Sequence, residues 1–172
     1  MTHRTQTRSL LLEPLPAAEL DANDPLARNV IDAIRTGDTA TIHRLFTDHP
    51  ELATARIGPR TLLHVATDWP GYFKNGVQTV IALIAAGADV NAPFTGPYHA
   101  ETPLHWAASS DDVAVLDALL DAGADIEASG SVIGSGTPLA DAVAFGQWHA
   151  ARRLIERGAK TTLLASGSLG AA

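Results

Sequence analysis

Three side chains in a short, aromatic-rich part of this sequence are suited to proton transfer. His99 and Glu101 lie two residues apart, and Asp68 directly precedes Trp69. A histidine and a carboxylate exchange protons near neutral pH when burial beside apolar groups shifts their pKa values. His99, Glu101 and Asp68 are therefore the candidate catalytic residues if the chain is an enzyme.

The sequence lacks the residues that other common kinds of catalytic site require. The chain has no cysteine, which excludes thiol nucleophiles, disulfides and zinc–thiolate sites. It has no HExxH sequence, no paired Cys/His spacing and no acidic EF-hand loop, so we expect no metal site. The glycine-rich segment 130–136 matches neither the GxSxG turn nor a phosphate-binding loop. We therefore expect no cofactor.

The charge balance and the N-terminus narrow the choice of partners. Twelve basic and nineteen acidic residues give a formal net charge of −7, which on average repels a nucleic-acid backbone. The apolar run Leu10–Leu12 is broken by Glu13 and Pro14 and is too short for a signal core or a membrane span. We expect no nucleic-acid partner, no membrane contact and a cytoplasmic location.

The sequence repeats itself, and its composition favours helices. Alanine and leucine dominate, whereas aromatic residues make up only 5% of the chain, which indicates an all-α class. Two motifs recur in order. The first motif is TLLHVA at 61–66, TPLHWA at 102–107 and TPLADA at 137–142, and the second motif ends on Gly87, Gly123 and Gly158.

These motifs resemble the ankyrin repeat, whose signature is TPLHxA followed by LLxxGADVN. The resemblance covers roughly residues 25–165. It implies a solenoid of about four helix-turn-helix repeats with extended finger loops. We expect a flexible N-terminal tail over 1–23 and an ankyrin domain over 24–172. Its repeats lie near 24–57, 58–92, 100–128 and 135–165, followed by a C-terminal cap.

The physical signals for helix ends agree with these repeats. Threonine before proline caps a helix, because proline at the first position loses only an amide that has no partner there. Glycine after the last turn can take the left-handed conformation that ends a helix. The signals and apolar periodicity predict four inner helices near 25–36, 61–68, 102–109 and 137–145. The predicted outer helices are near 39–48, 77–86, 112–122 and 147–157.

Three loops are longer than the family pattern requires, namely 68–76, 93–101 and 129–136. In the ankyrin architecture such loops project beside the inner helices, and insertions there often mark the binding face. We therefore expect a pocket that combines the proton-transfer candidates with Trp69, Tyr72, Phe94, Tyr98, Trp106 and Ser109. In an alternative interpretation, the aromatic residues of 68–76 only fold that long turn onto its own helices.

The remaining histidines favour structural or solvent-exposed roles. His64 and His105 occupy the histidine position of TPLH. The resemblance implies that they bridge adjacent repeats through hydrogen bonds to the backbone. His43, His49 and His149 fall on predicted outer helices or their ends, where we expect them in solvent.

Two classes of function remain open at this point. The family resemblance favours a binding module that recognises a protein segment with the concave face and the finger loops. The alternative is a small cofactor-free enzyme, a lyase or cyclase. It would perform dehydration, addition or cyclisation on a small apolar molecule held in the same groove.

Overall fold

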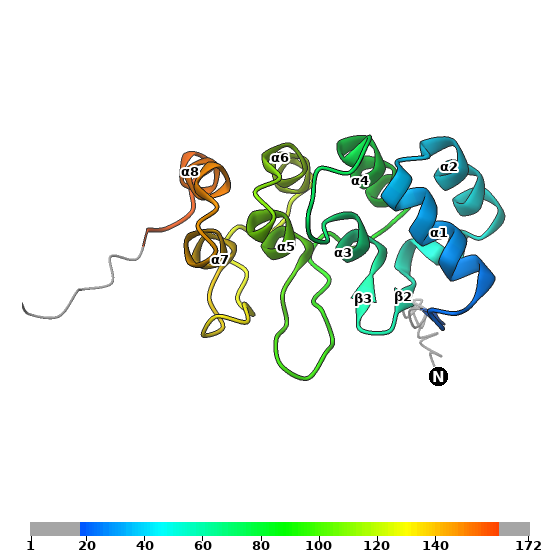
Figure 1. Ribbon diagram of the computed structural model, residues 1–172, viewed down its shortest axis with the longest axis horizontal. Coiled ribbons are helices and arrows are strands. Elements are labelled where there is room, and N and C mark those ends of the chain that lie inside the picture. The colour runs from blue at the N-terminus through cyan, green and yellow to red at the C-terminus, as the bar shows by residue number, and fades with distance from the viewer. Residues whose placement is uncertain (1–17, 162–172) are drawn as a thin grey trace, which may run out of the picture.

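The computed structural model describes residues 18–161. Four helix pairs stack side by side, and in Figure 1 the first helices of the pairs form one row beneath the row of second helices. The inner helices are α1 (Pro25–Thr36), α3 (Leu62–Ala66), α5 (Pro103–Ser109) and α7 (Pro138–Ala144). The outer helices are α2 (Thr39–Asp48), α4 (Gly76–Ala85), α6 (Val113–Asp121) and α8 (Trp148–Glu156). The predicted all-α solenoid of four repeats is confirmed.

Local signals set the helix ends as the sequence predicts. Pro103 and Pro138 occupy the first positions of α5 and α7, each preceded by a threonine. At the other end of the repeats, Gly123 follows α6 with a φ of 90° and Gly158 follows α8 with a φ of 100°. Only glycine adopts this backbone region readily, so the chain leaves the outer helix and turns into the next loop there.

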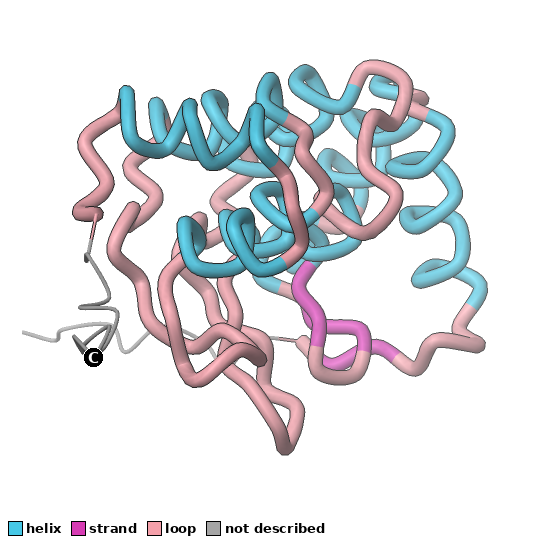
Figure 2. The backbone as a smooth tube through the Cα atoms, turned by 60° about the vertical axis from the view of Figure 1, so that its left-hand side comes forward, coloured by secondary structure: helices cyan, strands magenta, loops and turns pink. Residues whose placement is uncertain are grey.

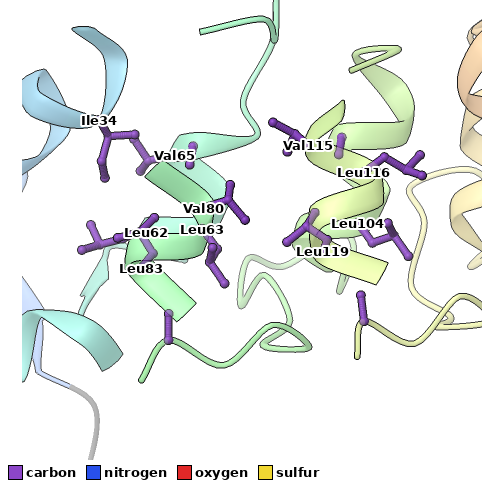
Figure 3. Packing of buried hydrophobic residues seen from close by; sticks show 14 of the residues in the cluster. Ile34, Leu62, Leu63, Val65, Val80, Leu83, Leu104, Val115, Leu116 and Leu119 are labelled. Carbon is purple, nitrogen blue, oxygen red and sulfur yellow. The ribbon is translucent and has the colours of Figure 1, made fainter. Parts of the chain in front are cut away.

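The core is a continuous layer of leucine, alanine and valine between the two rows of helices. Leu62, Leu63 and Leu83 meet in the second repeat, and Leu104 and Leu119 meet in the third (Figure 3). Alanines on the inner helices, such as the fully buried Ala107 and Ala108, allow neighbouring repeats to approach closely.

His64 and His105 bridge neighbouring repeats, as the family resemblance implied. The Nδ1 atom of each ring accepts a hydrogen bond from the threonine that caps its helix, at 3.3 Å from Thr61 N and 3.0 Å from Thr102 N. Nε2 therefore carries the proton. It donates to the carbonyl of Glu101 at 2.9 Å in the first case and of Gly136 at 3.3 Å in the second. Each histidine thus fastens the following loop to its own inner helix.

Short strands mark the first loop between repeats. The strands β2 (Arg56–Ile57) and β3 (Arg60–Thr61) pair antiparallel, and β1 (Glu19–Leu20) pairs parallel with β2. Figure 2 shows these strands and the loops between repeats on one side of the helix layers. The free edge of β2 accounts for this pairing of β1, which lies in the segment expected to be a flexible tail. Residues 1–17 and the expected cap over 162–172 lie outside the described residues.

Candidate functional site

A pocket of about 170 Å³ lies where three inner helices meet residues of all three long loops. Five of its residues were predicted as site residues, and they come from loops 68–76 and 93–101 and from α5. The pocket is lined by Asp68, Trp69, Glu101, Trp106, Ser109, Ser110, Val132 and Phe145. The structure therefore brings together two of the three candidate acid–base residues and three of the six predicted ligand-binding residues.

Glu101 connects two of the loops at this pocket. It is only 7% exposed, and its Oε2 accepts a hydrogen bond from Trp106 Nε1 at 2.8 Å. Its Oε1 accepts a second bond from the backbone amide of Val132 at 2.9 Å. A buried carboxylate needs such donors in place of water. Glu101 thus holds the Trp106 side chain and loop 129–136 in fixed positions beside the pocket.

His99 and Phe94 support Glu101 from outside the pocket lining. Their rings stack face to face, with centroids 4.3 Å apart and planes 4° from parallel. His99 Nδ1 lies 3.3 Å from Glu101 Oε2, and the Phe94 ring lies 5.9 Å from that of Trp106. The predicted neighbours His99 and Glu101 are therefore in contact, but His99 does not line the pocket.

Asp68 is held by two arginines. Its Oδ2 lies 3.3 Å from Arg60 and 3.6 Å from Arg35, and its Oδ1 accepts the amide of Trp69 at 3.0 Å. Neither arginine lines the pocket. Asp68 is consequently an anchored carboxylate at the pocket edge, with Trp69 next to it and 77% exposed.

Tyr72 and Tyr98 do not reach the pocket, so the expected convergence of five aromatic residues is wrong for these two. Tyr98 is 88% exposed on loop 93–101. Gly71 and Tyr72 both have positive φ angles, and they turn the chain toward the outer helices. There the Tyr72 amide donates to Asp112 Oδ2 at 2.7 Å, and its hydroxyl donates to the Asp111 carbonyl. The alternative interpretation of turn 68–76 does not describe Tyr72, which bonds to the start of α6 in the next repeat, and it does not describe the exposed Trp69.

The comparison with known proteins settles the family. A family model described as ankyrin repeats (3 copies) matches residues 30–130 and again residues 63–164. These matches cover well over half of the chain. The chain belongs to the ankyrin-repeat family. Ankyrin repeats generally mediate protein binding.

Two curated proteins with similar sequences are much longer than this ankyrin chain. A palmitoyltransferase AKR1 from Lachancea kluyveri is 34% identical over 119 residues, which cover 66% of this chain and 15% of that protein. A RelA-associated inhibitor from mouse is 35% identical over 100 residues, which cover 58% of this chain and 11% of that protein. The chain thus spans less than a sixth of either relative.

Sequence reasoning missed the buried carboxylate Asp141 behind the pocket. It is 1% exposed and accepts a hydrogen bond from the Ser131 hydroxyl. Burial raises the pKa of Asp141 to about 6, and the neighbouring Glu101 carboxylate adds to this rise. An alignment of the ankyrin repeats contains the signal, because Asp141 takes the place of Trp106 in the next repeat. A charged residue at a buried motif position marks a special role.

Besides Ser110 at the end of α5, Val132 and Phe145 were also missed as pocket residues. Both follow from loop and helix-end geometry that no single motif encodes, since Phe145 lies just after α7 and Val132 lies within the third long loop. Within residues 18–161, no group of three His, Asp or Glu side chains is placed to hold a metal ion. None of the helices in that range is long and apolar enough to cross a membrane.

Proposed function

We propose that this ankyrin chain is a protein-binding module whose concave face and finger loops recognise a segment of a partner protein. The observation that carries the proposal is the exposed Trp69 at the rim of a pocket lined by Trp106 and Phe145. Tryptophan side chains beside small, well-formed pockets are enriched among the residues that dominate protein–protein affinity. Because Trp69 is 77% exposed, it contributes little packing energy to the fold, so packing does not explain why a tryptophan stands there.

The size of the pocket favours this function over the enzyme alternative. Sites for small molecules enclose about 300–1,000 Å³. The present pocket, at about 170 Å³, has room for one inserted side chain rather than for an enclosed apolar metabolite. Of the three candidate catalytic residues, Asp68 is bound by two arginines and His99 lies outside the lining. These positions support a role in shaping and orienting the site more than one in proton transfer.

The class of partner and the location belong to the same proposal. The formal net charge of −7 supports a protein partner over a nucleic acid, because phosphate would be repelled on average. The absence of cysteine is in keeping with a reducing cytoplasm.

Cross-linking in the cells that produce the protein tests the proposal. A photoreactive phenylalanine analogue replaces Tyr98 on the finger loop in one variant and Trp148 on the outer helix α8 in a control variant. Both positions are exposed, at 88% and 64%. We expect a discrete cross-linked protein from position 98 and none from position 148. Cross-linking from position 148 alone, or from neither position, would overturn the proposal.

A further inference from the structure

The lining of the Trp69 pocket combines aromatic walls with charges of one sign. Its aromatic members are Trp69, Trp106 and Phe145, and its only charged members are Asp68 and Glu101. Ser109 and Ser110 add hydroxyl groups at the end of α5. The pocket thus presents two carboxylates and three aromatic rings, with no basic residue among the lining side chains.

Both carboxylates are fixed before any ligand arrives. Glu101 is held by Trp106 Nε1 and by the Val132 amide. Asp68 is held by the amide of Trp69 and by Arg60 and Arg35 from outside the lining. Preorganised groups lose little conformational entropy on binding, so their charges are available to a ligand at low cost.

The chemistry of the lining discriminates between kinds of side chain. An acidic side chain would be repelled by Asp68 and Glu101. An apolar side chain would bury the part of Asp68 that is still exposed, 28% of its side chain, without supplying a further opposite charge, which is unfavourable. A cationic side chain supplies that charge and is also attracted to the faces of the aromatic rings.

We infer that the pocket binds a single cationic side chain, a lysine or an arginine, of the protein partner. The inference rests on the proposed binding function and specifies what enters the site. A pocket of about 170 Å³ matches one long side chain, and the exposed Trp69 covers its stem while the head group meets the carboxylates.

Amino-acid derivatives titrated into the protein test this directly. The probes are the N-acetyl, N′-methylamide derivatives of lysine, arginine, norleucine and glutamate, followed by NMR of the three tryptophan indole N–H signals. Trp69 and Trp106 line the pocket, whereas Trp148 lies elsewhere, beside Val143 and Ile155. We expect lysine or arginine to shift the first two signals with about three- to tenfold higher affinity than norleucine. The Trp148 signal should stay unchanged, and the ratio of the two cationic probes distinguishes lysine from arginine.

A matched pair of variants separates charge from general binding. Asp68→Asn should weaken binding of the cationic probes and slightly strengthen that of norleucine, because norleucine then removes one carboxylate fewer from water. Asp117→Asn is the control, because Asp117 is also bound by two arginines, Arg153 and Arg157, but on the outer helices. It should change neither probe.

The outcomes distinguish this inference from the binding function on which it rests. Equal affinity for norleucine and the cationic probes, or no shift of Trp69 and Trp106 with any probe, overturns the cationic pocket. The binding function then still stands if position 98 cross-links to a partner. Cationic probes that bind selectively in a protein without any cross-linked partner leave the pocket chemistry intact and overturn the binding function instead.

Discussion

At the scale of single residues, Asp141 carries an energetic cost at neutral pH that can be measured. Its folded pKa of about 6 lies above the usual 3.8, so the folded state holds its proton more tightly than the unfolded state. Stability from this group is therefore present at low pH and is lost as pH rises from about 4 to about 6. Above that range the buried charge costs up to about 3 kcal/mol.

The substitution Asp141→Asn removes this charge and retains an oxygen that can accept the Ser131 hydroxyl. We expect the variant to be more stable than the wild type at pH 7, and the gain to shrink toward pH 4. Urea unfolding at both pH values measures the difference. A variant that is destabilised equally at pH 7 and pH 4 would show that Asp141 acts as a carboxylate in the native network.

His64 titrates in the opposite sense. Burial lowers its pKa from 6.5 to about 4, so the unfolded state binds the proton more tightly. Its contribution to stability is complete above pH 6.5 and falls by about 3 kcal/mol as pH drops toward 4. Because Asp141 offsets this loss in the wild type, we expect the decline to be clearest in the Asp141→Asn background. Urea unfolding between pH 7 and pH 4.5 measures it. A flat profile there contradicts a neutral, buried His64.

At the scale of secondary-structure elements, packing energy and surface function separate in one pair of substitutions. Leu104 on α5 is fully buried between repeats, so Leu104→Ala should cost on the order of 2–5 kcal/mol through the cavity it leaves. Trp69, in the loop after α3, is 77% exposed, so Trp69→Ala should cost about 0.5 kcal/mol or less. Urea titrations compare the two variants. Similar losses would mean that Trp69 serves the fold of the long turn.

The elements that sequence reasoning located are those whose signals are local. The caps of α5 and α7 depend on adjacent Thr-Pro pairs, and the ends of the outer helices depend on single glycines, so a short stretch of sequence contains each signal. The course of turn 68–76 depends on a bond between the Tyr72 amide and Asp112, forty residues away. No local pattern could direct Tyr72 to the outer helices.

The residues of the candidate site, like the helices, could be predicted only where their signals are local. Trp106 and Glu101 could be found because the motif and the adjacent long loop place them at one end of α5. Asp141 and Phe145 could not, because their positions depend on how the fourth repeat stacks beside the third. Long-range contacts of this kind are absent from a single repeat and appear only when neighbouring repeats are assembled.

At the scale of the whole molecule, hydrogen bonds join two finger loops and three inner helices into the one surface that we propose as the recognition surface. His64 and His105 fasten the loops to the helices, and Glu101 links the two loops through Trp106 and the Val132 amide. In a solenoid each repeat contacts only the repeats next to it. These hydrogen bonds join the second repeat to the third and the third to the fourth, so the surface spans the second to fourth repeats. Binding should therefore depend on residues of this surface and not on the outer helices.

The affinity for the partner captured by cross-linking tests this account most directly. Isothermal titration calorimetry with purified partner compares Trp69→Ala with Trp148→Ala, a matched tryptophan on α8 that is 64% exposed. We expect Trp69→Ala to weaken binding at least about tenfold, as for a residue at the centre of an interface, and Trp148→Ala to change it by less than about twofold. Weaker binding by Trp148→Ala with unchanged binding by Trp69→Ala would place the interface on the outer helices and contradict the account.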